Sequence, residues 1–169
     1  MGLFDRLRGK AESKDYGVLY EAGKLYAPIT GTYIPLEEIP DPVFSQGILG
    51  PGCGIEPEEG TVYAPVDGTI STIADTKHAV GISSANGEEL LIHVGMDTVS
   101  MNGKGFQLKV KTGDKVKAGQ PLMDFDMEAI KAAGYPTVTA FILANADQYP
   151  NMNLRVGEHH AAKEEVGTV

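Results

Sequence analysis

Two histidines fifteen positions apart, His78 and His93, are the residues of this chain best suited to chemistry near neutral pH. An imidazole titrates close to pH 7, so it serves as a nucleophile, a general acid or base, or a metal ligand. Each histidine lies in a β-prone run, and Asn86-Gly87 lies between the two runs. Asn-Gly favours a two-residue hairpin loop, because both residues tolerate the positive φ of a type I′ turn. The sequence therefore predicts a hairpin that carries both histidines.

A two-residue loop at this Asn-Gly fixes which residues face each other across the hairpin. It places His78 opposite Gly95, and His93 opposite Val80. Side chains alternate between the two faces of a strand, so one face is predicted to hold Thr76, His78, His93, Gly95 and Asp97. The histidines are then diagonal neighbours, about 7–8 Å apart at the backbone. A three-residue loop or a bulge would shift the register by one residue and separate the rings, so the prediction depends on the loop.

Length and composition indicate one globular domain without long helices. The chain has 169 residues, which is enough to bury a proper core. Its 21 glycines and 10 prolines favour short strands joined by tight turns. The net charge of −9 argues against nucleic-acid binding, because no basic patch could offset it, and the single cysteine, Cys53, excludes an intramolecular disulfide. No apolar run reaches membrane-spanning length and no signal-peptide pattern is present, so we expect a cytoplasmic protein.

Three regions differ in composition along the chain. Their expected bounds are 1–20 for a flexible N-terminal segment, 21–157 for a β domain and 158–169 for a C-terminal tail. In the first ten residues Leu3, Phe4 and Leu7 have helical spacing among basic residues, which is typical of an amphipathic segment that contacts an anionic membrane surface. In the tail, His159 and His160 are expected to be solvated.

An internal repeat lies within the predicted β domain. Tyr26-Ala-Pro-Ile-Thr-Gly-Thr32 recurs 37 residues later as Tyr63-Ala-Pro-Val-Asp-Gly-Thr69, with five identities in seven positions. Such a repeat predicts a duplicated β-motif whose halves pack together. Strand follows strand elsewhere with little helix, so the predicted fold class is an all-β antiparallel sandwich or barrel.

Five motifs agree in order and spacing with one known family between about residues 21 and 145. They are Asp41-Pro-Val-Phe44, Ala64-Pro-Val-Asp-Gly-Thr69, Thr76-Lys-His-Ala79, Leu91-Ile-His-Val-Gly-Met-Asp-Thr-Val99 and Gly103-Lys-Gly-Phe106. The chain closely resembles the glucose-family enzyme IIA component of the bacterial phosphoenolpyruvate:sugar phosphotransferase system, in its free-standing form. The family fold is a duplicated hybrid β-sandwich, which agrees with the repeat.

The resemblance implies a phosphoryl carrier with a phosphohistidine intermediate and no required cofactor. The carrier accepts the phosphoryl group from the phosphocarrier protein and passes it to the sugar-specific IIB domain of the IIB/IIC permease. Residue by residue, the resemblance implies that His93 is the acceptor, that His78 is its partner and that Thr76 orients His78. It also implies that the backbone carbonyl of Gly95 fixes the His93 ring.

Partners of such a carrier would dock on the face around the histidines. We expect a desolvated apolar ring there, formed by Val43, Phe44, Val94, Met96 and Val99. Asp41 and Asp97 would offer carboxylates at the rim, which aid the steering of basic partners more than affinity. Regulatory protein targets are expected on the same face.

Two other functions fit the same residues. The first is a zinc-dependent hydrolase of β-hybrid fold, because His93-x-x-x-Asp97 has the spacing of a ligand pair and His78 would add a third ligand. The second is a regulatory binding module that is never phosphorylated. Zinc would also bind the two histidines of the carrier when a partner protein donates a carboxylate. Incubation with a phosphoenolpyruvate-charged phosphocarrier protein discriminates among these functions.

Overall fold

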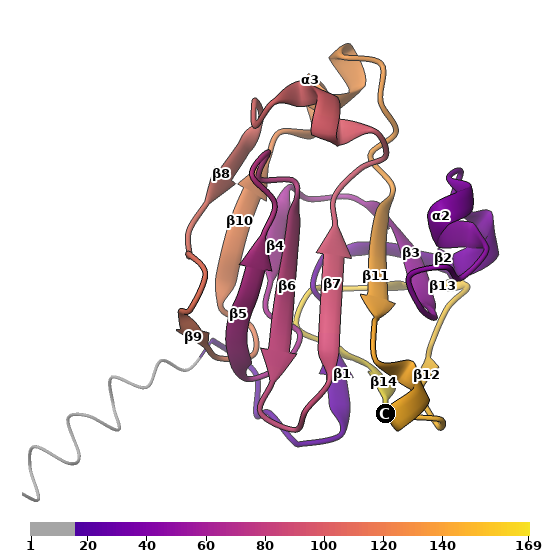
Figure 1. The fold of residues 1–169 in the computed structure, drawn as a ribbon, viewed down its shortest axis with the longest axis vertical. Helices are drawn as coiled ribbons and strands as arrows, with labels where there is room; N and C mark the ends of the chain where they lie inside the picture. Colours follow the sequence, from indigo (N-terminus) through magenta and orange to yellow (C-terminus); the bar gives the residue numbers. More distant parts are fainter. Residues whose placement is uncertain (1–15) are drawn as a thin grey trace, which may run out of the picture.

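The structure, a computed structural model, describes residues 16–169, and the predicted amphipathic segment in residues 1–10 lies outside the described residues. Strands dominate these residues, and the helical pieces are short (Figure 1). The strands are β1 (Lys24–Tyr26), β2 (Gly31–Pro35), β3 (Gly52–Pro57), β4 (Thr61–Tyr63), β5 (Gly68–Ile73), β6 (Ala79–Ser84), β7 (Glu89–His93), β8 (Phe106–Leu108), β9 (Lys115–Val116), β10 (Pro121–Phe125), β11 (Thr139–Leu143), β12 (Asn153–Leu154), β13 (Glu158–His160) and β14 (Glu165–Thr168). The helical pieces are η1 (Leu36–Glu38), α2 (Pro42–Ser45), η2 (Thr98–Met101), α3 (Met127–Ala132) and η3 (Ala146–Gln148). The predicted all-β class is confirmed.

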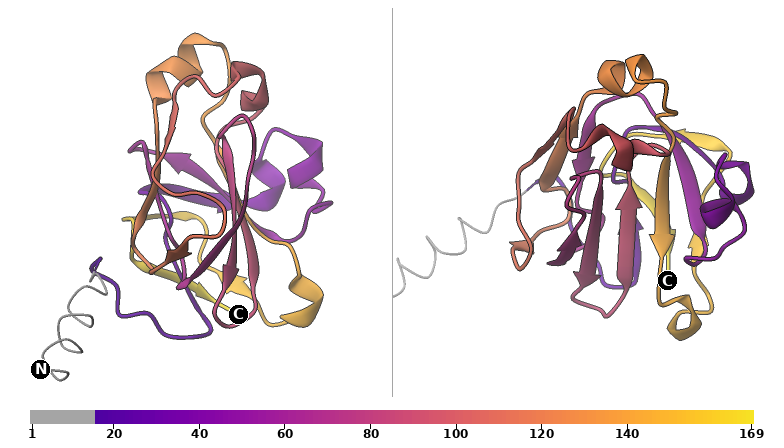
Figure 2. Two further views of the ribbon diagram at one scale, coloured as in Figure 1. Left: turned by 60° about the vertical axis from the view of Figure 1, so that its left-hand side comes forward. Right: turned by 45° about the horizontal axis from the view of Figure 1, so that its top comes forward.

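Three antiparallel sheets enclose the core. The largest has eight strands in the order β13-β2-β3-β11-β7-β6-β5-β9, and two three-stranded sheets have the orders β1-β14-β12 and β4-β10-β8. β7 lies in the middle of the large sheet, between β6 and β11, and its carboxyl end points toward α3 in Figure 1. The turned views show α3 at one end of the molecule and α2 on its flank (Figure 2). Among residues 16–169, no helix is long and apolar enough to cross a bilayer.

The two copies of the sequence repeat bind each other through matching backbone hydrogen bonds. Tyr26 donates its N–H to the carbonyl of Pro65 at 3.0 Å, and Tyr63 donates to the carbonyl of Pro28 at 2.8 Å. Tyr26 and Tyr63 are equivalent positions of the repeat, and so are Pro28 and Pro65. The two halves of the predicted duplicated motif are therefore joined by reciprocal backbone hydrogen bonds.

Residues 158–169, expected to form a tail, instead complete the half that contains the first copy of the repeat. Ala27 donates its N–H to Glu164 at 2.7 Å, and at the equivalent position Ala64 donates its N–H to Gln120 at 2.9 Å. Likewise β13 and β14 pair with β2 and β1, as β9 and β10 pair with β5 and β4. The segment is part of the β domain because these strands cover the main-chain edges of β1 and β2.

The segments 113–120 and 157–164 are also equivalent residue by residue. Gly113 and Gly157, before β9 and β13, have positive φ angles of 94° and 84°. Val116 lies opposite the first residue of β5, and His160 lies opposite the first residue of β2. His160 therefore occupies a core position, with 3% of its surface exposed, and the prediction that it is solvated is wrong. The neighbouring His159 points outward and is exposed, as expected.

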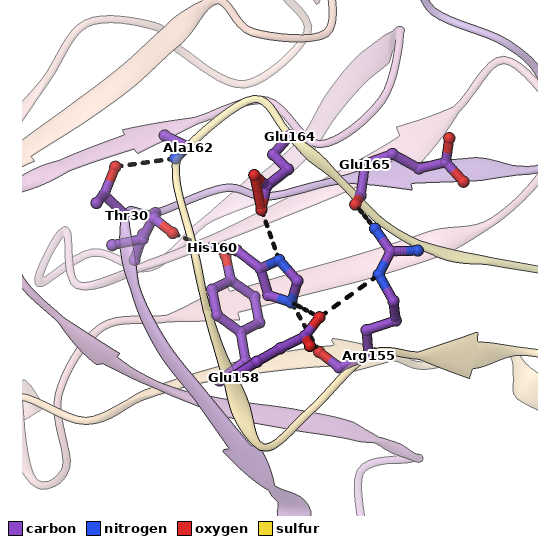
Figure 3. A network of polar contacts seen from close by, with 9 residues as sticks. Thr30, Arg155, Glu158, His160, Ala162, Glu164 and Glu165 are labelled. Atoms are coloured by element: carbon purple, nitrogen blue, oxygen red, sulfur yellow. Dashed lines mark hydrogen bonds and ion pairs between the residues drawn. The ribbon is translucent and has the colours of Figure 1, made fainter.

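Polar contacts surround the buried ring of His160 (Figure 3). Its Nδ1 lies 2.6 Å from a carboxylate oxygen of Glu164, and its Nε2 lies 3.1 Å from the carbonyl of Arg155 and 3.3 Å from Glu158. Its ring also meets the ring of Tyr33 edge-on, with centroids 5.0 Å apart. Both ring nitrogens face oxygen acceptors, so polar contacts hold the buried ring from two sides.

The β6–β7 hairpin has a three-residue loop, so the predicted register is wrong by one residue. Ser84 and Glu88 close the loop, through a hydrogen bond of 2.8 Å from Ser84 N–H to the Glu88 carbonyl, and His93 lies opposite Ala79. Of the Asn-Gly pair only Gly87 has a positive φ, 98°. A single left-handed residue is typical of a three-residue hairpin loop, in which a type I turn is followed by one glycine of positive φ.

Candidate active site

His93 is held at the end of a central strand. It is the last residue of β7, and it lies opposite Ala79 on one neighbouring strand and Ala140 on the other. Its Nδ1 lies 2.9 Å from the backbone carbonyl of Gly95. A carbonyl only accepts hydrogen bonds, so Nδ1 carries the proton and the neutral ring keeps a lone pair on Nε2. The ring is therefore fixed in the tautomer that offers Nε2 as a nucleophile.

Gly95 makes this contact from a conformation that suits only glycine. Its φ is 75°, in the left-handed region. A Cβ at this position would lie 2.5 Å from Cγ2 of Thr98 and 3.0 Å from the carbonyl oxygen of Pro136. The chain therefore needs glycine here both for the turn and for the close approach of its neighbours.

His78 reaches the site from a loop and not from a strand. It immediately precedes β6, and Lys77 before it has a φ of 66°. This left-handed residue interrupts the alternation of side chains, so the position of His78 does not follow the register of the hairpin. The rings of His78 and His93 meet edge-on, with centroids 4.7 Å apart and planes at 84°. The predicted pairing of the histidines is correct, although the register from which we predicted it is wrong.

Thr76 contacts the far side of the His78 ring. Its Oγ1 lies 2.8 Å from Nδ1 of His78. When the hydroxyl donates this bond, the neutral imidazole carries its proton on Nε2. The predicted residues Thr76, His78, His93 and Gly95 thus form one connected group.

Burial keeps both imidazoles uncharged at neutral pH. Burial, with a smaller contribution from the nearby His78, lowers the pKa of His93 to about 4, although the hydrogen bond to Gly95 and the charge of Asp41 act in the opposite direction. Burial also lowers the pKa of His78, against a smaller raising effect of the Thr76 backbone. A neutral imidazole is the nucleophilic form, so the site is poised to accept an electrophile at pH 7.

Aromatic side chains flank the two histidines. The ring of Phe44 lies 4.9 Å from that of His93, and the ring of Phe106 lies 6.4 Å from that of His78. Asp41 caps the helix that carries Phe44, because its carboxylate accepts the N–H of Val43 at 2.9 Å. We did not predict Phe106 as a site residue, although it ends one of the motifs.

The predicted docking residues divide into surface and core. Val43 and Val99 are 42% and 52% exposed, and Asp97 is also exposed. Phe44, at 4% exposed, is buried and offers partners little of its surface. Val94 and Met96 are 0% and 1% exposed, so their side chains pack inside the protein and not on the docking surface. The sequence could not distinguish them, because alternation ends where the chain leaves β7 for a tight turn.

Two exposed apolar residues near α2 were missed. Ile48 and Leu49 are 64% and 41% exposed, and they follow two residues after the end of the helix that carries Phe44. Their signal is two large aliphatic residues between glycines, Gly47 and Gly50, in a stretch that forms no strand. Exposed side chains of this size and clustering indicate an interaction surface.

A zinc centre built from the chain alone is not supported. Within residues 16–169, no group of three or more histidine, cysteine, aspartate or glutamate side chains has an arrangement that holds a metal ion. The three ligands of the hydrolase alternative, His78, His93 and Asp97, are therefore not assembled. A catalytic zinc site needs three protein ligands, so the pair of histidines is incomplete as one.

Comparisons with known proteins agree on one class. The sequence model of the family described as phosphoenolpyruvate-dependent sugar phosphotransferase system, EIIA 1, matches residues 23–149. The glucose-specific EIIA component of the phosphotransferase system of Staphylococcus epidermidis is 43% identical over 152 residues, which cover 90% of this chain and 89% of that protein. The β-glucoside-specific EIIBCA component of Bacillus subtilis is 52% identical over 125 residues, which cover 74% of this chain and 20% of that longer protein.

A solved structure shares the fold as well. Glucose permease IIA from Mycoplasma capricolum superposes with a TM-score of 0.73 at 33% identity, and the match covers 85% of this chain and 93% of that one. The chain belongs to the EIIA 1 family of the phosphoenolpyruvate-dependent sugar phosphotransferase system. It is a phosphotransferase component that carries a phosphoryl group on a histidine and passes it to the sugar-specific IIB component.

Proposed function

We propose that His93 is the histidine that carries the phosphoryl group, and that the group is bound at Nε2. The observation that carries this proposal is the 2.9 Å contact from Nδ1 of His93 to the Gly95 carbonyl, which leaves Nε2 as the nucleophile. The phosphocarrier protein supplies the phosphoryl group. In the transfer the bond from phosphorus to the donor's nitrogen breaks as the bond to Nε2 forms, and the proton on Nδ1 stays in place.

His78 stabilises the transferred group in this proposal. Phosphoryl transfer depends on positioning and on stabilisation of charge on the equatorial oxygens. His78 approaches the His93 ring edge-on, and with Thr76 bound at Nδ1 it presents an N–H at Nε2. A charge-assisted hydrogen bond to phosphate contributes about 1.5–3 kcal/mol, equivalent to one or two decades in rate if it forms mainly in the transition state.

Partners dock on the exposed apolar surface beside the histidines. Val43 and Val99 offer the apolar contact, and Phe44 shields the His93 ring from one side. Water excluded from this surface cannot hydrolyse the group during transfer between two proteins. Asp41 and Asp97 steer basic partners toward the site.

The staphylococcal relatives that match nine-tenths of the chain are named as glucose-specific, which supports a glucose permease as the recipient of the phosphoryl group.

Variants at the two histidines test these roles. With a phosphoenolpyruvate-charged phosphocarrier protein, we expect wild-type protein to gain one acid-labile, alkali-stable phosphoryl group. His93→Gln should gain none, because the nucleophile is lost. His78→Gln should still accept the group but lose most of its onward transfer to IIB. His159→Gln is the control, because His159 is exposed and its ring nitrogen contacts a surface carboxylate, that of Glu58, at 3.1 Å. A phosphoryl group on His93→Gln would refute the assignment.

Zinc at the histidine pair is a secondary proposal. His78 and His93 supply two imidazoles, and a partner carboxylate would have to complete the site. We expect no stoichiometric zinc binding by the protein alone and binding in a complex with such a partner, measured by calorimetry with His78→Gln as the control. Tight zinc binding by the isolated protein would contradict this and favour the hydrolase alternative.

The sequence and the family membership support a proposal about where the protein acts in the cell. We infer a cytoplasmic location, with residues 1–10 in peripheral contact with the membrane that holds the permease, and regulatory targets that bind the docking surface. The basic residues among apolar ones in the first ten positions support the membrane contact. Sedimentation with anionic vesicles tests it, and equal binding by a protein lacking residues 1–10 would reject it.

A further inference from the structure

The carbonyl that orients His93 belongs to a turn held on both sides. The Gly95 carbonyl shares a planar peptide unit with the N–H of Met96, so fixing one fixes the other. The N–H of Met96 donates to the carbonyl of Pro136 at 3.1 Å. Backbone from the segment before β11 therefore holds one of the two peptide units that meet at Gly95.

The other peptide unit is held by a side chain. Oγ1 of Thr98 donates to the carbonyl of Val94 at 2.6 Å, and this carbonyl belongs to the unit that precedes Gly95. Thr98 is fully buried, with 0% of its surface exposed. Its Cγ2 also lies against Gly95, where a Cβ would stand 2.5 Å away. Thr98 thus holds this turn in two ways: its hydroxyl donates a hydrogen bond, and its methyl group packs closely against Gly95.

The turn needs such support because Asp97, two residues after Gly95, is held in a strained conformation. Gly95 and Asp97 both have left-handed φ angles, 75° and 61°. A residue other than glycine in this region costs free energy and persists only where its surroundings hold it. Without the Thr98 hydroxyl, the carbonyl of buried Val94 would lose its partner, and the turn would gain freedom to rotate the Gly95 carbonyl away from the His93 ring.

We propose that Thr98 is a positioning residue for phosphoryl transfer: its hydroxyl fixes the Gly95 turn, and through it the Nδ1–H tautomer of His93. The inference rests on the proposed role of His93 as acceptor. In this proposal Thr98 acts through the backbone of residues 94 and 95, which its hydroxyl and its methyl group contact.

Three variants separate the hydroxyl from the rest of the side chain. Thr98→Val keeps the shape and removes the hydroxyl, whereas Thr98→Ser keeps the hydroxyl and removes the methyl group. Thr139→Val is the matched control, because Thr139 is also 0% exposed and its hydroxyl also binds a backbone carbonyl, that of Thr137 at 3.2 Å. The tautomer of His93 is measured by ¹⁵N NMR in unphosphorylated protein, and the rate of phosphorylation by single turnover.

We expect Thr98→Val to convert the single Nδ1–H tautomer of His93 into a mixture and to slow phosphorylation about tenfold, because the nucleophile is no longer aligned. Thr98→Ser and Thr139→Val should keep the wild-type tautomer. An unchanged tautomer in Thr98→Val, or a mixture in Thr98→Ser, would overturn the proposal. If Thr98→Val does not fold, Thr98→Ala is compared with Thr98→Ser, and equal tautomer populations in these two variants would refute it.

The tautomer measurement also keeps the two proposals apart. It uses protein without a phosphoryl group, so it reports on Thr98 whether or not His93 is the acceptor. A phosphoryl group found on another residue of wild-type protein would reject the role of His93, while a tautomer change in Thr98→Val would still show that the hydroxyl controls the ring.

Discussion

At the scale of the residue, the chemistry of this protein depends on an imidazole that is kept neutral and oriented. Burial and the nearby His78 lower the pKa of His93 to about 4, and the Gly95 carbonyl selects which nitrogen carries the proton. Because the acceptor must be unprotonated, the low pKa widens the range of pH in which phosphorylation proceeds. The same shift makes the folded state sensitive to acid.

The first prediction concerns this pH dependence. We expect the His93 ring to titrate at about pH 4 in NMR spectra, compared with 6.5 for an ordinary histidine. The unfolded chain binds a proton at His93 below pH 6.5 and the folded chain does not, so stability falls as the pH drops from 6.5 toward 4. In urea unfolding, His93→Gln should lose less of its free energy of unfolding between pH 7.5 and pH 5 than the wild-type protein does. Part of the loss should remain, because the pKa of His78 is also lowered. A His93 midpoint near 6.5 would contradict the burial argument.

At the scale of the element, the turn after β7 and the loop before β6 determine the geometry of the site. Sequence reasoning found both histidines, Thr76 and Gly95, because their residue types and spacing are distinctive. It placed them on one strand face, which is wrong for His78. The rings meet because Lys77 adopts a left-handed conformation, and no local pattern predicts that for a lysine.

The second prediction tests the turn at Gly95. Gly95→Ala should lower the free energy of unfolding by about 1–3 kcal/mol and abolish most phosphorylation, because the new methyl group would displace Thr98 or Pro136. The comparison is Gly113→Ala, at a glycine with a φ of 94° but no atom within 4 Å of the added Cβ. That variant should lose about 1 kcal/mol from backbone strain alone and keep normal phosphorylation. Equal phosphorylation by both variants would argue against the turn as the device that orients His93.

At the scale of the whole molecule, the fold is a duplicated motif, and the half that begins with β1 is completed by β13 and β14 at the other end of the chain. The repeat at Tyr26 and Tyr63 was visible in the sequence because five of seven residues are identical. The second repeat, in which Gly157-Glu158 corresponds to Gly113-Asp114, was not recognised because few identities remain and a histidine replaces a core valine. The polarity of His160 did not predict its burial, because the carboxylates of Glu158 and Glu164 provide partners for its ring nitrogens.

The third prediction compares the two adjacent histidines of β13. His160→Ala should lower the free energy of unfolding by about 2–4 kcal/mol, because it leaves a cavity against Tyr33 and removes the contacts to Glu158 and Glu164. His159→Ala should change it by no more than about 0.5 kcal/mol, since that ring is exposed. Urea unfolding monitored by circular dichroism measures both. A similar small effect of the two variants would mean that the second half of the fold does not depend on the His160 contacts.

The pairing of the first strand with the last has a consequence for how this domain is built into larger proteins. Lys24 of β1 lies opposite Thr168 of β14, and Figure 1 shows these two strands at the end of the molecule away from α3. β7, whose last residue is His93, points toward α3. The paired first and last strands therefore lie away from the end of the molecule toward which β7 points. We expect a domain with this arrangement to keep the same reactive face when it forms one part of a longer chain, as in the matched one-fifth of the B. subtilis protein.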